Sequence, residues 1–105
     1  MRQLNKVFEK KGEDAVTISF LYNGKLMQRV AGIKEIGDGI FAGYVTANKK
    51  ITGRWVWNTR QYDNPVFYSE KVSCHGRPLR ITKGALNEAL KDLVLTAKSG
   101  VLIAA

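Results

Sequence analysis

The chain has 105 residues, of which 17 are Lys or Arg and 9 are Asp or Glu, giving a formal net charge of +8. A chain of this length has room for one hydrophobic core, so we expect a single domain over residues 1–105. Its apolar fraction of 45% is that of a folded protein rather than a disordered one. The basic excess favours a polyanionic partner, either nucleic acid or an acidic protein surface.

Cys74 is the only cysteine, so the chain can form no internal disulfide. The longest apolar stretches are too short to span a bilayer, and the N-terminus lacks the basic and apolar regions of a secretory signal. We therefore expect a cytoplasmic protein without a membrane partner.

The first residues predict a short amphipathic helix, because Leu4, Val7 and Phe8 fall on one face. Gly12 is placed to end this helix, since glycine adopts the left-handed conformation without strain. Residues 15–22 alternate between apolar and polar side chains, which predicts a strand with one buried face.

Asn23-Gly24 is the clearest hairpin signal, because both residues tolerate the positive φ of a type I′ turn. Residues 25–34 predict the returning strand, in which Gly32 and a mixed pattern indicate a bend or a bulge.

Glycine, proline and Asn/Asp clusters divide the following residues into further short strands. The predicted strands cover residues 40–48, 51–62 and 66–72, with a short extended segment at 79–81. The predicted connections between them are Gly37-Asp38-Gly39, Lys49-Lys50, Asp63-Asn64-Pro65 and His75-Gly76-Arg77-Pro78.

A second helix is predicted near the C-terminus, with Thr82 as its cap and Gly100 at its end. Its apolar residues recur at helical spacing: Leu86, Ala89, Leu90, Leu93, Val94 and Ala97. The apolar tail at 101–105 predicts a packing contact, either within the chain or with another copy, and the second alternative implies a homodimer or higher oligomer through this helix and tail.

The order of helix, about five antiparallel strands and helix indicates an α+β fold that is mostly β. Either a small SH3/Sm-like barrel or a curved open sheet is compatible with this order.

Counting residues excludes most catalytic constellations. His75 is the sole histidine and neighbours the sole cysteine, so a closed zinc site within one chain is not expected. Cys74 and His75 are adjacent, and neighbours in an extended segment point to opposite faces, which disfavours a nucleophile–base pair. We expect a buried or half-buried thiol, no metal or other cofactor, and no enzymatic activity.

The most informative segment is Arg54-Trp55-Val56-Trp57-Asn58-Thr59-Arg60. In a strand the two tryptophans share one face, and Arg54, Asn58 and Arg60 lie on the other. The tryptophans either fill the core or offer a stacking platform for bases. In both interpretations the arginine face is available to phosphate.

Further basic residues are candidates for the same surface: Arg29, Lys34, Lys49, Lys50, Lys71, Arg77, Arg80 and Lys83. The cluster from Lys71 to Lys83 carries four cations and precedes a helix N-terminus, whose dipole adds positive potential. This cluster predicts an anion site, although a solvated charged rim explains it almost equally well.

The stretch VTISFLYNGKLMQRVAG at 16–32 resembles the first hairpin of the bacterial Sm-like RNA chaperone. It is also similar to the small WYL-type proteins with an SH3-like barrel that many phages encode. This resemblance implies a barrel, and it implies RNA binding only weakly, because the second RNA-contacting motif of the Sm-like family has no counterpart after Lys50. The stretch HGRPLRITKGALNEAL at 75–90 resembles the last strand and helix of Pur-like single-strand binders, which are dimers built on a curved sheet.

Two functions follow. The first is a non-enzymatic protein that binds the phosphate backbone of RNA or single-stranded DNA. The second is a small inhibitor of phage type that binds and blocks a host protein.

Overall fold

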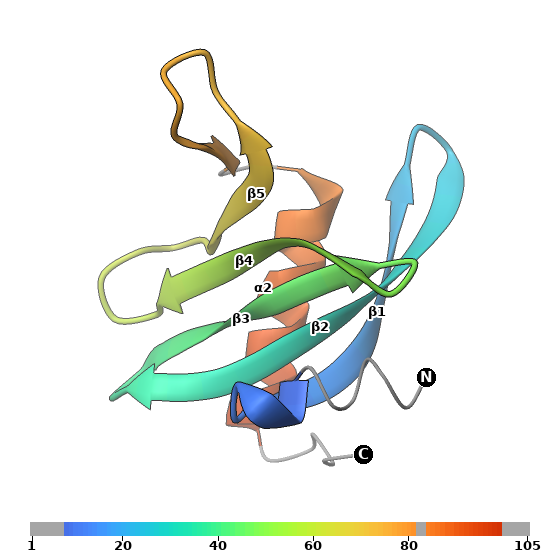
Figure 1. The fold of residues 1–105 in the computed structure, drawn as a ribbon. Helices are drawn as coiled ribbons and strands as arrows, with labels where there is room; N and C mark the ends of the chain where they lie inside the picture. Colours follow the sequence, from blue (N-terminus) through green and yellow to red (C-terminus); the bar gives the residue numbers. More distant parts are fainter. Residues whose placement is uncertain (1–7, 82–83, 100–105) are drawn as a thin grey trace.

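One antiparallel sheet forms most of the structure, a computed structural model that describes residues 8–81 and 84–99. Its six strands are β1 (Asp14–Tyr22), β2 (Lys25–Gly37), β3 (Ile40–Ala47), β4 (Lys50–Asn58), β5 (Val66–Val72) and β6 (Pro78–Ile81). Each strand pairs with the next along the chain, so the spatial order is β1-β2-β3-β4-β5-β6 (Figure 1). Helix α2 (Ala85–Lys98) follows the last strand and lies behind the sheet in this view.

The sheet is open, with β1 and β6 as its two edges. The barrel alternative was therefore wrong, and the curved sheet is the arrangement found. The sheet also has six strands rather than about five, because the segment predicted at 79–81 pairs with β5 as a full strand.

The β1–β2 turn has the geometry expected of Asn-Gly, with φ of 51° at Asn23 and 77° at Gly24. The β3–β4 connection repeats this geometry with a different sequence, since Asn48 and Lys49 have φ of 50° and 67°. The second turn therefore holds a lysine in a left-handed conformation that glycine adopts more easily.

No bulge lies at Gly32, so that alternative for this residue was wrong. The register shift in β2 lies instead between Glu35 and Gly37. Gly32 is required by close packing, because a Cβ there would collide with the Phe8 ring and the Glu13 carboxylate.

The predicted N-terminal helix is described only from residue 8, and Leu4 and Val7 lie outside the described residues. Residues 8–10 are helical, and Phe8 is fully buried. The turn ends as predicted at Gly12, whose φ is 71°. Its backbone N–H donates to Glu9, and the next N–H, of Glu13, donates to Phe8, which is the Schellman pattern.

Helix α2 buries the predicted apolar stripe against the sheet: Ala89, Leu90, Leu93 and Val94 are buried, and Leu86 and Ala97 pack against the same core. Buried Asn87 donates from Nδ2 to the carbonyls of Pro65 and Ile81, tying the helix to the ends of β5 and β6. The helix cap is Gly84 and not Thr82. Thr82 itself, Gly100 and the apolar tail lie outside the described residues.

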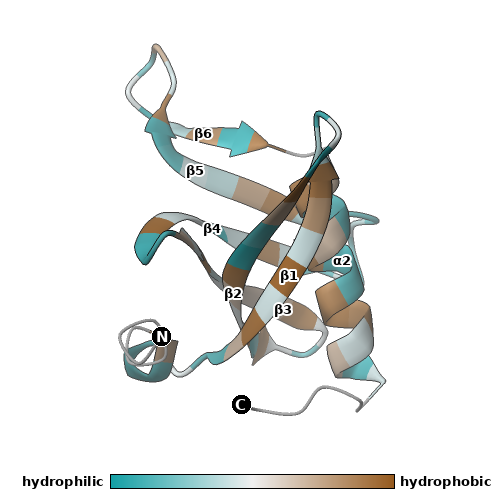
Figure 2. Cartoon of the chain, turned by 90° about the vertical axis from the view of Figure 1, so that its right-hand side faces the viewer, coloured by the Kyte–Doolittle hydropathy of each residue, from teal (hydrophilic) through white to brown (hydrophobic). Residues whose placement is uncertain are grey.

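Alternation along the strands gives the sheet two different faces. One face carries the core residues Ile18, Phe41, Val45, Trp55 and Phe67 and is covered by α2. Figure 2 shows α2 on one side of the sheet and the N-terminal helical turn on the other. We call the face opposite α2, which carries Tyr44, Arg54, Tyr68 and Arg80, the open face.

Candidate functional site

Both tryptophans of β4 are core residues. Trp55 is 1% exposed and Trp57 is 5% exposed. Trp55 Nε1 donates to the Gly32 carbonyl at 3.1 Å, and Trp57 Nε1 donates to the Tyr62 carbonyl at 2.9 Å. The hypothesis that a tryptophan stacks on bases was therefore wrong, because the large rings fill the space between the sheet and α2.

Arg54 lies on the open face, as the alternation predicted, and the sheet register aligns it with three other side chains. Tyr44 pairs with Arg54 across β3 and β4, and Arg54 pairs with Tyr68 on β5. Tyr68 in turn pairs with Arg80 on β6. Directly opposed residues of an antiparallel sheet share a face, so the four residues form one row of alternating tyrosine and arginine.

Two cations lie against the tyrosine rings of this row. The Arg54 guanidinium is 5.9 Å from the centre of the Tyr68 ring. From the N-terminal turn, Lys11 Nζ reaches to 5.3 Å from the Tyr44 ring. Lys34 of β2 donates from Nζ to the Lys11 carbonyl at 2.8 Å, so its charge lies at the same end of the row. Such distances are those of cation–π contacts, which hold the side chains in a defined arrangement.

Among the described residues that surround Lys11, Lys34 and Tyr44, Glu13 is the only acidic one, and it is only 6% exposed. Its Oε1 accepts the backbone N–H of Tyr44 at 2.9 Å. Burial raises the pKa of Glu13, while the Tyr44 hydrogen bond and the charges of Lys34 and Lys11 act in the opposite direction.

The predicted site residues did not include Glu13, Lys11, Tyr44 or Tyr68. The tyrosines are seen to share a face with Arg54 only once the strand register is known. For Glu13 the sequence contains no such signal, since its burial depends on the N-terminal turn folding over Gly32.

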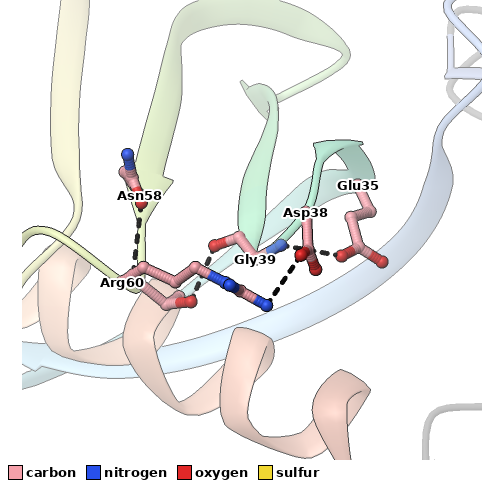
Figure 3. Close-up of polar contacts among 6 residues, drawn as sticks. Glu35, Asp38, Gly39, Asn58 and Arg60 are labelled. Carbon is pink, nitrogen blue, oxygen red and sulfur yellow. Dashed lines mark hydrogen bonds and ion pairs between the residues drawn. The ribbon is translucent and has the colours of Figure 1, made fainter.

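Asn58, the last residue of β4, lies on the Arg54 face as predicted, because it pairs with Ile40 and alternates with the buried Trp57. Arg60 does not extend this face, because β4 ends at Asn58 rather than at residue 62. Asn58 Oδ1 accepts the Arg60 backbone N–H at 3.2 Å, a side-chain turn that ends the strand. Arg60 Nη2 then forms an ion pair with Asp38 at 2.7 Å, next to the Gly39 backbone (Figure 3). Its positive charge is thereby partly compensated at the far end of the strand.

The remaining predicted cations are distributed over four places. Arg29 of β2 lies on the face that carries Ile18, with its guanidinium 5.9 Å from the centre of the Phe20 ring, and so does not join the row. Lys49 and Lys50 are exposed at the β3–β4 turn, Lys71 and Arg77 are exposed toward the end of the β5–β6 hairpin, and Arg80 belongs to the row on the open face. Lys83 lies outside the described residues. The described members of the predicted Lys71–Lys83 cluster are thus spread along a hairpin, and of these only Arg80 joins Arg54.

Cys74 is exposed in the β5–β6 turn, so the expectation of a buried or half-buried thiol was wrong. His75 beside it is also exposed. Within residues 8–81 and 84–99, no three His, Cys, Asp or Glu side chains are grouped as metal ligands. No helix in these same ranges is long and apolar enough to cross a membrane.

Comparison with known proteins identifies no relative: no family model, curated protein or solved structure matches the chain.

Proposed function

We propose that this protein binds single-stranded nucleic acid across the open face. The observation that carries the proposal is the row Tyr44–Arg54–Tyr68–Arg80, which crosses four strands on the face that α2 leaves uncovered. Sheets that bind single strands combine aromatic rings, on which bases stack, with cations that follow the phosphates. Duplex DNA instead requires an element that enters a groove, and a row of side chains across one face of a sheet is not such an element.

The charge of the open face sets the expected salt dependence. Four cations, Lys11, Lys34, Arg54 and Arg80, lie in or beside the row. Each phosphate contact to a single strand contributes about 0.7 to the slope of log affinity against log salt, so four contacts predict a slope of about −3. Affinity should then fall about 50-fold between roughly 50 and 200 mM salt.

Fluorescence anisotropy with labelled RNA, single-stranded DNA and duplex DNA of about 12 nucleotides tests the proposal. Arg54→Gln should reduce the salt slope by about 0.7. Tyr68→Ala should weaken binding about 5- to 150-fold and leave the slope unchanged, because stacking releases few counterions. Comparing the RNA and DNA strands in the same series determines which of them is preferred.

Arg60→Gln is the matched control, since it removes the same charge from the same segment but from a side chain paired with Asp38. We expect this variant to bind like the wild type. The proposal would be contradicted if the protein did not bind single strands, or if its affinity for them did not change with salt concentration.

A second candidate function is a small inhibitor that docks on another protein. The observation in its favour is the β1–β2 hairpin end, where the cross-strand pair Leu21 and Leu26 is 64% and 66% exposed. This function predicts no nucleic-acid binding, and a protein complex from bacterial lysate that the double substitution Leu21→Ser with Leu26→Ser abolishes.

A further inference from the structure

The ladder between β2 and β3 is interrupted at the centre of the sheet. Val30 and Ala31 pair with Thr46 and Val45, and pairing resumes at Lys34 with Ala42. Residues 32–33 of β2 and 43–44 of β3, all within the described part of the chain, form no pair with each other, although each keeps its partner on the neighbouring strand, β1 or β4. The Tyr44 N–H is bonded to Glu13 Oε1 instead, and the Gly32 carbonyl accepts the Trp55 indole N–H.

A cavity of about 390 Å³ opens on the open face at this interruption. Its inner wall includes the buried residues Glu13, Gly43 and Trp55, and its mouth is lined by the exposed cations Lys11, Lys34 and Arg54. The two tyrosines of the row, Tyr44 and Tyr68, also line it. A volume of this order holds a small planar group.

The cavity has an acceptor inside and positive charge outside. Glu13 Oε1 uses one lone pair on the Tyr44 N–H, and a carboxylate has about four acceptor positions in all. A ligand that fits therefore directs hydrogen-bond donors inward and carries negative charge at its outer end. A nucleotide of a single strand has this polarity when its base edge donates.

Guanine is the base whose Watson–Crick edge offers two adjacent donors, N1–H and the N2 amino group. Adenine and cytosine place an acceptor nitrogen beside their amino group, and uracil has one N–H between two carbonyls. A carboxylate accepts both guanine donors side by side, whereas the other bases bring an acceptor against it.

We infer that this cavity takes one unpaired guanine of the bound strand, with the Glu13 carboxylate accepting from guanine N1–H and N2–H. The tyrosine rings contact the base, and Lys11, Lys34 and Arg54 face the adjoining phosphates. The inference rests on the proposed binding of single strands and adds a base preference to it.

Anisotropy with labelled oligouridine that carries one central guanine, or one central adenine, tests this preference. We expect wild-type protein to bind the guanine strand about 5- to 150-fold more tightly. Inosine at the same position lacks the N2 amino group and should lose part of the gain, and 1-methylguanine, which lacks N1–H, should lose most of it. These ligand changes require no substitution in the protein.

Glu13→Gln should abolish the guanine preference and leave binding of plain oligouridine at least as tight as before, because one negative charge is removed. Glu35→Gln is the matched control, since Glu35 is exposed on the adjoining β2 strand and does not line the cavity. Equal binding of guanine and adenine strands, or a preference that survives in Glu13→Gln, would overturn the inference alone. Failure of wild-type protein to bind plain oligouridine or the guanine strand would overturn the proposed function as well.

Discussion

The two buried tryptophans provide a direct test of the interruption between β2 and β3. Trp55→Phe and Trp57→Phe make the same change on the same strand and the same face, at positions 1% and 5% exposed. Each removes one indole N–H donor and a similar ring volume, so the packing losses largely cancel in the comparison. What differs is the carbonyl that each substitution leaves without its donor.

Trp55→Phe removes the hydrogen-bond donor of the buried Gly32 carbonyl, which accepts no backbone N–H from the neighbouring strand. Tyr22 and Lys25 flank the β1–β2 turn, and every second residue of β2 from Lys25 onward directs its N–H and C=O to β1. Gly32 lies between two such residues, so its N–H and C=O are directed toward β3. There its expected donor, the Tyr44 N–H, is bonded to Glu13. An unsatisfied buried acceptor costs about 1–3 kcal/mol. The Tyr62 carbonyl bonded to Trp57 belongs to an exposed residue and can accept from water, so its loss costs about 0.5–1.5 kcal/mol.

We therefore expect Trp55→Phe to lower the free energy of unfolding by about 1 kcal/mol more than Trp57→Phe does. Urea denaturation followed by far-UV circular dichroism measures both values, and the difference corresponds to about 4–8 °C in melting temperature. Equal losses of unfolding free energy, or a larger loss for Trp57→Phe, would refute the idea that the Trp55 indole N–H replaces the missing backbone donor to the Gly32 carbonyl.

Further substitutions test the turns and the buried carboxylate. Lys49→Gly should stabilise the protein by up to about 1 kcal/mol because Lys49 has a φ of 67°, whereas Gly24→Lys, at a φ of 77°, should destabilise it by about as much. Thermal unfolding checks both, and a gain of the same size in Lys49→Ala, which keeps the Cβ, would contradict the explanation. Burial raises the pKa of Glu13 above its ordinary value of 4.5, so the folded state holds this proton more tightly than the unfolded state. The stability of the wild type relative to Glu13→Gln should therefore be highest below pH 4.5 and fall as the pH rises through the folded pKa of Glu13. Urea denaturation of both proteins at several pH values measures this difference. A difference that stays constant or increases with pH would contradict the raised pKa.

Local signals were sufficient for the strands and turns that depend on neighbouring residues. Asn23-Gly24 predicted its hairpin correctly, and Gly12 predicted the end of the N-terminal turn, because positive φ is a property of single residues. Local signals failed where a side chain redirected the backbone. Asn58 accepts the Arg60 N–H and ends β4, so Arg60 was placed on the wrong side of that boundary.

The sequence by itself determined the basic charge, the antiparallel hairpins and the opposite orientations of Arg54 and the two tryptophans, because these follow from composition and from the period of a strand. Only the tertiary structure decided that the sheet stays open and that the tryptophans are buried under α2. It also decided which residues join Arg54, since Tyr44, Tyr68 and Arg80 come from strands whose alignment depends on turn lengths and register shifts. Glu13 enters this site because Phe8 and the N-terminal turn pack over Gly32, a contact between distant residues that no local pattern encodes.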